Sequence, residues 1–281
     1  MIDLHLHTTA SDGLLSPSDL VLRARAAGLF VISITDHDTT AGCDAARGAA
    51  RAAGVDLIPG IEISAVDNGR DVHILGYSID TASPRLRSFL ETQREERLRR
   101  VREMGDRLEA LGCPVDVVPI LESAARGRSV GRPQIAAALL AKGYVATRDE
   151  AFDRFLEHGG PAYVARRGAA PSEVVAIVHE AGGVASLAHP GVLRRDELIA
   201  RLAAAGLDGL EALHSDHDEV TEARYRALAR DLDLLVTGGS DFHGDVQHRA
   251  TRFGELSMSS AELDALRRAA DRRRGAVDSR Q

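Results

Sequence analysis

The chain has 281 residues and a net charge of −7 at pH 7, which provide for one barrel-sized domain with an insertion. The acidic balance argues against a protein that coats nucleic acid, because binding along a phosphate backbone needs a basic face. The N-terminus shows no signal-peptide pattern and no window is apolar enough to span a membrane, so we expect a cytoplasmic protein with no membrane partner and no obligate protein partner.

Short apolar runs alternate with helical patterns in the first third of the chain. This pattern predicts, in order, a strand over 2–6, a helix from the Ser16-Pro17 start to Gly28, a strand over 30–35, a helix over 41–53 and a strand over 55–63. The turn Asp67-Asn68-Gly69 then predicts a hairpin with a strand over 72–77.

The alternation stops between residues 84 and 163. An apolar stripe from Leu90 to Leu111 predicts a long helix, and further helices are predicted over 134–142 and 148–158. The charged run 94–100 interleaves Glu and Arg three and four apart, which is typical of a solvated helix face. We therefore predict a barrel domain of residues 1–83 and 164–281, and a helical insertion of residues 84–163 that caps the active site.

Strand and helix patterns alternate again in the C-terminal half. After a short strand over 162–164, the pattern predicts helices over 171–181, 196–205 and 221–230 and strands over 184–188, 209–213 and 234–237. Alternation of this kind indicates a parallel sheet, and about seven units in one domain favour an α/β barrel over an open sheet.

Histidine and carboxylate residues collect where the predicted strands end. His5 and His7 close the first strand on the same side, since side chains alternate along a strand. The other members, in chain order, are Asp12, His37, Glu62, His73, His189, Asp241 and His243. The C-terminal ends of barrel strands converge on one face, and carboxylates buried together there would repel one another without a cation. These residues therefore predict a metal centre.

Six segments, in this order, resemble the PHP (polymerase and histidinol phosphatase) family: IDLHLHTTASDG, ITDHDT, PGIEIS, VHILGY, LAHPG and TGGSDFHG. The resemblance covers nearly the whole chain and is closest to the branch of nucleoside 3′,5′-bisphosphate phosphatases and 5′ to 3′ exoribonucleases. It implies a distorted seven-stranded β/α barrel with a helical insertion that binds two or three divalent cations.

The resemblance also implies how the ligands divide among the cations. One site would use His5, His7 and Asp241, a second would use Asp12, His37 and His243, a third would use His73 and His189, and Glu62 would bridge. Mixed histidine and carboxylate ligands suit manganese, iron or zinc, whereas magnesium prefers oxygen ligands. We expect manganese, with iron, zinc or magnesium as alternatives.

Candidate substrate contacts lie outside the metal ligands. Gly131-Arg132-Pro133-Gln134 resembles the family's glycine-arginine-proline-histidine motif, and Arg132 offers the bidentate fork that suits phosphate. Gln134 stands where the family has histidine, and an amide cannot transfer a proton at neutral pH. Arg166 is a further candidate for phosphate binding.

His214 and His217 lie at the end of another predicted strand. We expect His214 to contact the substrate or to orient a ligand, and His217 to contact phosphate or to act as a catalytic acid. Asp3 and Asp36 are predicted to orient the ligand histidines.

The combined hypothesis is a metal-dependent phosphoric monoester hydrolase in which metal-bound hydroxide attacks phosphorus. The acidic charge and the few aromatic residues favour a 3′,5′-nucleoside bisphosphate or a short 5′-phosphorylated oligonucleotide, the latter implying 5′-3′ exonuclease activity. A histidinol-phosphate-type or other small-molecule phosphatase is one alternative. An amidohydrolase is another, although Glu62 would then replace the usual carboxylated lysine, because the only lysine is Lys142 in the insertion. The third is a non-catalytic metal-binding scaffold, which nine retained ligand positions disfavour.

Overall fold

Seven strands form one sheet in the computed structural model, which describes residues 1–244 and 251–278. They follow one another in chain order as β1 (Ile2–Leu6), β2 (Val31–Ile34), β3 (Asp56–Asp67), β4 (Arg70–Tyr77), β5 (Val184–Leu187), β6 (Gly209–His214) and β7 (Leu235–Gly239). Strand β4 runs antiparallel to β3 and β5, and the other neighbours are parallel. The sheet nearly closes, because the backbone N–H of His7 donates to the carbonyl of Phe242 beyond β7 at 3.0 Å. The predicted barrel is thus confirmed.

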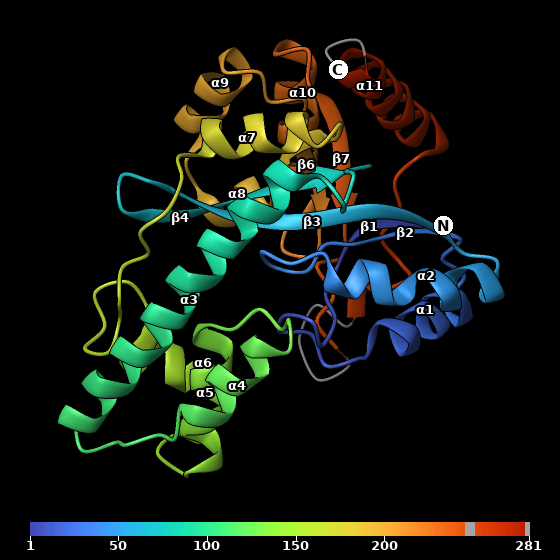
Figure 1. The fold of residues 1–281 in the computed structure, drawn as a ribbon. Helices are drawn as coiled ribbons and strands as arrows, with labels where there is room; N and C mark the ends of the chain where they lie inside the picture. The colour runs from blue at the N-terminus through green and yellow to red at the C-terminus, as the bar shows by residue number, and fades with distance from the viewer. Residues whose placement is uncertain (245–250, 279–281) are drawn as a thin grey trace.

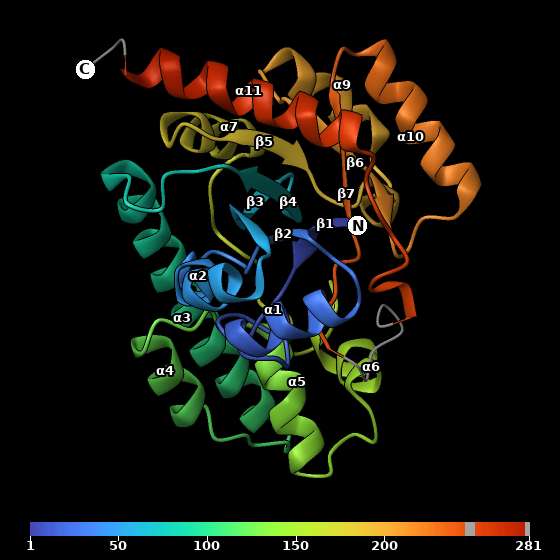
Figure 2. The same ribbon diagram turned by 90° about the vertical axis from the view of Figure 1, so that its right-hand side faces the viewer.

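One set of helices covers the outside of the sheet (Figures 1 and 2). Its members are α1 (Pro17–Ala26), α2 (Ala41–Ala53), α7 (Pro171–Glu180), α8 (Pro190–Leu193), α9 (Asp196–Ala204), α10 (Glu219–Asp231) and α11 (Ser260–Asp278). The predicted start of α1 is correct, since the Ser16 hydroxyl accepts the Asp19 N–H at 3.1 Å. Among the described residues, no helix is long and apolar enough to cross a membrane.

A second set of helices extends away from the barrel, at the bottom of Figure 1. It comprises α3 (Pro84–Ala110), α4 (Val118–Ala125), α5 (Arg132–Ala141), α6 (Arg148–Ala151) and the π-helical turn η1 (Phe152–Leu156). These helices bury their own apolar cluster, which includes Val101, Met104, Leu108, Ile135 and Leu139. The capping role and the domain boundaries remain predictions.

Two expectations for this region need correction, and one helix was not expected. Residues 162–164 form no strand, and their extended chain is held instead by arginine side chains of α3. The helix predicted over 148–158 changes to a π-helical turn and ends at Leu156. Helix α4 was not predicted, because it is too short to show a clear helical period of apolar residues.

Glycine is required on β7 because this strand comes close to β1. A Cβ at Gly239 would lie 2.3 Å from the backbone nitrogen of His5 and 2.5 Å from its Cβ. We expect Gly239→Ala to lower the free energy of unfolding by about 1–3 kcal/mol, the usual cost of overpacking. Urea titration would measure this change. Gly48→Ala is the matched control, because a Cβ on this exposed face of α2 would meet nothing within 4 Å and should stabilise by roughly 0.5–1 kcal/mol. An unchanged stability of Gly239→Ala would contradict the close approach.

Candidate metal centre

The side chain of Glu62 lies at the centre of the predicted ligands. Its Oε1 is 2.8 Å from Nδ1 of His73 and 3.1 Å from Nε2 of His189. Its Oε2 is 3.0 Å from Nδ1 of His37 and 3.3 Å from Nε2 of His7. One carboxylate thus faces two groups of histidines, the arrangement that a bridging ligand requires.

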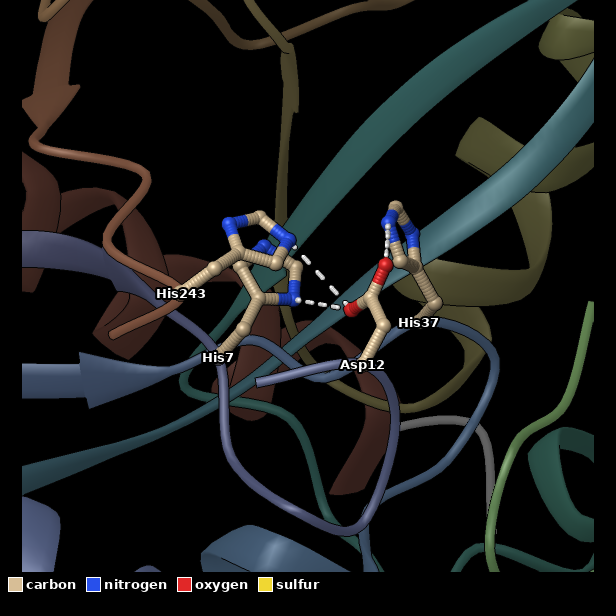
Figure 3. A group of neighbouring side chains, drawn as sticks. All are labelled: His7, Asp12, His37 and His243. Carbon is tan, nitrogen blue, oxygen red and sulfur yellow. Dashed lines mark ion pairs between the residues drawn. The ribbon is translucent and has the colours of Figure 1, made fainter. Parts of the chain in front are cut away.

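Four residues, His7, Asp12, His37 and His243, form one cluster (Figure 3). Asp12, in the loop after β1, points between three imidazole rings: its Oδ1 is 3.3 Å from Nε2 of His243 and 3.7 Å from Nδ1 of His7, and its Oδ2 is 3.8 Å from Nε2 of His37. The ligand atoms of all four lie within 4.8 Å of one another. This geometry fits the second predicted site with His7 added.

A second group is deeper in the barrel and consists of His5, His7 and Asp241. Oδ1 of Asp241 is 3.1 Å from Nε2 of His7 and 3.4 Å from Nε2 of His5. The backbone φ is 52° at Asp241 and 29° at His189, values that non-glycine residues rarely adopt. Such strain persists only where the surroundings impose it, and here it occurs at two predicted ligands.

Glu211 on β6 was not predicted as a site residue, yet it supports two ligands. Its Oε1 is 2.8 Å from Nδ1 of His5, and its Oε2 accepts the backbone N–H of His189 at 2.7 Å. His214, three residues further along β6, is 3.2 Å through Nε2 from Oδ2 of Asp241. Both side chains are buried and contact ligand residues, so we assign His214 to orienting Asp241.

The chemistry of the donor set tests whether these residues fit cations. Both ring nitrogens of His7 and Nδ1 of His189 are buried without a well-aligned hydrogen-bond partner. Buried polar atoms are nearly always satisfied, and an imidazole nitrogen without a partner can be satisfied by a metal ion. The residues therefore fit two or three divalent cations.

Charge coupling within this group predicts proton release when metal binds. Burial lowers the pKa of His7, but Asp241 and Glu62 beside it raise that pKa to about 10. Burial likewise lowers the pKa of His5, which Glu211, Asp241 and Glu62 raise well above its ordinary value. At neutral pH the metal-free rings therefore hold protons that a cation must displace, so affinity should rise with pH.

Titration calorimetry of the metal-free protein in buffers of different ionisation enthalpy would measure this release. We expect roughly one to two protons released per protein at pH 7 as manganese fills the centre. Binding that is independent of both buffer and pH would contradict this protonation of the ligands.

Three of the predicted substrate contacts, Arg132, Gln134 and Arg166, line a small cavity of about 120 Å³. Asp12, His37 and His73 also line it, but the other two predicted contacts, His214 and His217, do not. Arg132 pairs with Asp71 at 3.0 Å, and Arg166 lies 3.4 Å from the same carboxylate. Although burial raises it, these two guanidinium groups lower the pKa of Asp71 to about 2, which keeps this carboxylate ionised.

Gln134 also borders the cavity, but its side chain bridges two backbone segments. Its Nε2 donates to the carbonyl of Ser11 at 3.0 Å and its Oε1 accepts the N–H of Gly131 at 2.7 Å. Arg128 donates to the same Ser11 carbonyl at 2.9 Å. Gln134 therefore links the loop that carries Asp12 to the helical insertion through hydrogen bonds. A contact between Gln134 and the substrate remains a prediction.

Asp3 and Asp36 accept hydrogen bonds from backbone N–H groups and from hydroxyls, rather than from the imidazole rings that we expected them to orient. Asp3 accepts the N–H groups of Ser240 at 3.0 Å and His5 at 3.2 Å, and burial raises its pKa to about 6. Asp36 accepts the N–H of Thr8 at 2.8 Å and the Ser11 hydroxyl at 2.6 Å. Both carboxylates therefore fix the loops from which ligands project.

The structure gives His217 a role that argues against the predicted acid or phosphate contact. Its Nδ1 donates to the carbonyl of Ala212 at 2.8 Å, and its Nε2 accepts the N–H of Gly191 at 3.1 Å. With both ring nitrogens engaged by backbone, this histidine joins α8 to the end of β6 and has no free nitrogen for a substrate.

Comparison with known proteins identifies a matching family and several relatives of this chain. The family model described as "PHP domain" matches residues 3–149. A 5′-3′ exoribonuclease of Haemophilus influenzae is 38% identical over 86% of this chain and 89% of its own length. A 3′,5′-nucleoside bisphosphate phosphatase of Chromobacterium violaceum is 34% identical over 86% of this chain and 87% of its own length. The crystal structure of a putative metal-dependent phosphoesterase from Bifidobacterium adolescentis superposes with a TM-score of 0.86 at 37% identity, covering 95% of this chain and 96% of that one.

Proposed function

The chain belongs to the PHP family of metal-dependent phosphoesterases, and from this we propose that it hydrolyses phosphomonoesters of small nucleotides. The proposed substrate is a 3′,5′-nucleoside bisphosphate or the 5′-phosphorylated end of a short oligonucleotide. These are the substrates that the names of the bisphosphatase and exoribonuclease relatives indicate for those proteins. One observation carries the proposal: the cavity of about 120 Å³ is lined both by candidate metal ligands and by arginines.

The cavity has the charge that a phosphate group needs. Four guanidinium groups line it: Arg97, Arg100, Arg132 and Arg166. Outside the candidate metal ligands, the carboxylates that pair with these arginines are Asp38 and Asp71. More positive than negative charge therefore faces the cavity, which favours an anion.

Arg100 supports this assignment independently. It is only 2% exposed, and its Nη2 has no hydrogen-bond partner. Burial, together with the charge of Arg166, lowers its pKa to about 10, so the guanidinium is still charged at neutral pH. A buried cationic donor without a partner is costly, and a phosphate oxygen in the cavity would satisfy it.

We assign the cations to three ligand groups. The first is His5, His7 and Asp241, the second is Asp12, His37 and His243, and the third is His73 and His189, with Glu62 between them. When bound, the metals would supply Lewis-acid stabilisation of charge and a water activated at neutral pH. Manganese is the proposed metal.

The protein side chains position the phosphate and limit its surroundings. The arginines hold the outer oxygens, and Glu211, His214 and Asp3 keep the ligand-bearing strand ends rigid. Neither Gln134, an amide, nor His217, whose ring nitrogens both bind backbone groups, is available as a proton donor to the substrate. Leaving groups that need no protonation by a side chain should therefore react fastest.

Phosphate release by manganese-loaded protein tests the proposal. The substrates are adenosine 3′,5′-bisphosphate, a short 5′-phosphorylated RNA and histidinol phosphate, and Asp241→Asn is the inactive comparison. We expect metal-dependent release from one or both nucleotide substrates, at least tenfold faster than from histidinol phosphate, and its loss in Asp241→Asn. Faster release from histidinol phosphate would favour the alternative small-molecule phosphatase. No release by protein shown to hold its metals would favour a scaffold.

A further inference from the structure

A second cavity, of about 390 Å³, adjoins the phosphate cavity on the side of His73. The two share Asp71, His73 and Arg132 as lining residues, so they are neighbours. The side chain of His189, a candidate ligand of the third metal, also lines this second cavity.

The walls of this cavity differ from those of the phosphate cavity. Val192 and Leu193 of α8 form an apolar wall directly after His189, and Val192 is 47% exposed. Tyr163 and His158 also line the cavity, and the centroids of their rings lie 5.1 Å apart. An apolar and aromatic cavity next to a charged phosphate site fits a substrate that has a flat, apolar part close to its phosphate.

The backbone on either side of Tyr163 is held in place by α3. Arg107 donates to the carbonyl of Tyr163, and Arg100 donates to the carbonyl of Val164 at 3.1 Å. Arg132 lies between the two cavities, with its guanidinium carbon 6.0 Å from the centroid of the Tyr163 ring. The aromatic ring is thus fixed relative to the arginine that faces phosphate, as a recognition residue should be.

We propose that a substrate with its phosphate in the first cavity extends into the second, which binds one nucleobase, with Tyr163 as the stacking residue and Val192 and Leu193 as further apolar contacts. The inference rests on the proposed nucleotide phosphoesterase activity. It concerns the part of the substrate that the phosphate cavity does not contact. Base stacking on an aromatic ring tolerates any base, so the cavity should select nucleotides over sugar phosphates more than one base over another.

Binding of non-hydrolysable ligands by the metal-loaded protein tests the proposal without turnover. The probes are the methylenephosphonate analogues of adenosine monophosphate and of ribose 5-phosphate, in which carbon replaces the ester oxygen, and calorimetry gives both affinities. We expect the adenosine analogue to bind roughly 5- to 100-fold more tightly, the range of one stacked base. Tyr163→Ala should remove most of this ratio without changing the affinity for the ribose analogue.

Two further variants make the outcome specific. Tyr163→Phe retains the ring and should keep the ratio, and Phe30→Ala, which truncates an exposed aromatic residue next to β2, should leave both affinities unchanged. Equal binding of the two probes by the wild type, or an equal loss of both in Tyr163→Ala, would overturn the nucleobase site. If the adenosine preference holds while no phosphomonoester is hydrolysed, the catalytic proposal fails and the binding site stands.

Discussion

Glu62→Gln should reduce phosphate release by about 10³-fold or more, because metal ions supply several kcal/mol of transition-state stabilisation and each 1.4 kcal/mol is a factor of ten. The amide has almost the shape of the carboxylate but carries no charge. Glu62 is within 3.5 Å of five histidine side chains: His5, His7, His37, His73 and His189. Removing its charge should therefore weaken more than one cation site at once.

Metal content and thermal unfolding separate this effect from misfolding. Manganese should raise the Tm of the wild type by binding to the folded state, and should raise that of Glu62→Gln much less. Elemental analysis should find fewer cations per chain in the variant. Glu109→Gln, on the exposed surface of α3, is the matched control and should behave like the wild type. A variant that keeps its full metal content and activity would show that Glu62 bridges nothing.

The barrel could be predicted from sequence because each of its strands has a local signal. Buried strands read as short apolar runs, and the helices between them begin at recognisable caps such as Ser16. The clustering of the candidate ligands could be predicted because the topology places the C-terminal strand ends on one face, so histidines that are distant in sequence meet there. His5 and His243 are 238 positions apart and lie in adjoining groups.

Residues that support the site through long-range contacts could not be predicted in this way. Glu211 has no distinguishing spacing, and its importance arises only because β6 lies where its carboxylate reaches His5. His217 looked like a free histidine beside the site, whereas the fold occupies both of its nitrogens with backbone groups. In each case the decisive partner comes from another segment of the chain.

The charged run 94–100 shows how local pattern and fold can disagree. Arg94 and Arg99 do pair with Glu91 and Glu96 on the surface, as the three-residue spacing predicts. Arg97 and Arg100, however, are buried and face the barrel. They follow Gln93 and precede Met104 at helical spacing, so they continue the buried stripe of α3. Because both residues are charged, this spacing was not recognised as part of a buried stripe.

Arg97→Met should lower the free energy of unfolding by about 3–5 kcal/mol, the cost of leaving a buried charge without its main partner. Arg97 is 2.7 Å through Nε and 2.6 Å through Nη2 from Oδ2 of Asp38, and both side chains are buried. It also donates to the carbonyl of Val130 at 3.1 Å and to the hydroxyl of Ser64 at 3.1 Å. This one side chain therefore connects α3 to β3 and to the segment before α5.

The matched control is Arg85→Met on the same helix, because Arg85 pairs with Glu180 in solvent and such pairs contribute only about 0–1 kcal/mol. The double variant Asp38→Asn/Arg97→Met removes both charges and should be more stable than Arg97→Met alone. Urea unfolding of the four proteins measures these differences, and equal losses in Arg97→Met and Arg85→Met would show that the buried pair has no special weight.

The pH dependence of a further variant, Asp38→Asn alone, identifies the carboxylate. Burial raises the pKa of Asp38, but Arg97 and Arg166 lower it below its ordinary value overall. A group whose pKa is depressed by folding stabilises the protein above its unfolded pKa, near 3.9, and this stabilisation is lost as pH falls through the folded pKa. The stability advantage of the wild type over Asp38→Asn should therefore be constant above about pH 5 and shrink in more acidic solution. An advantage that grew on acidification would mean that Asp38 is protonated in the folded protein, and Arg97 would then hold α3 through its backbone and hydroxyl contacts alone.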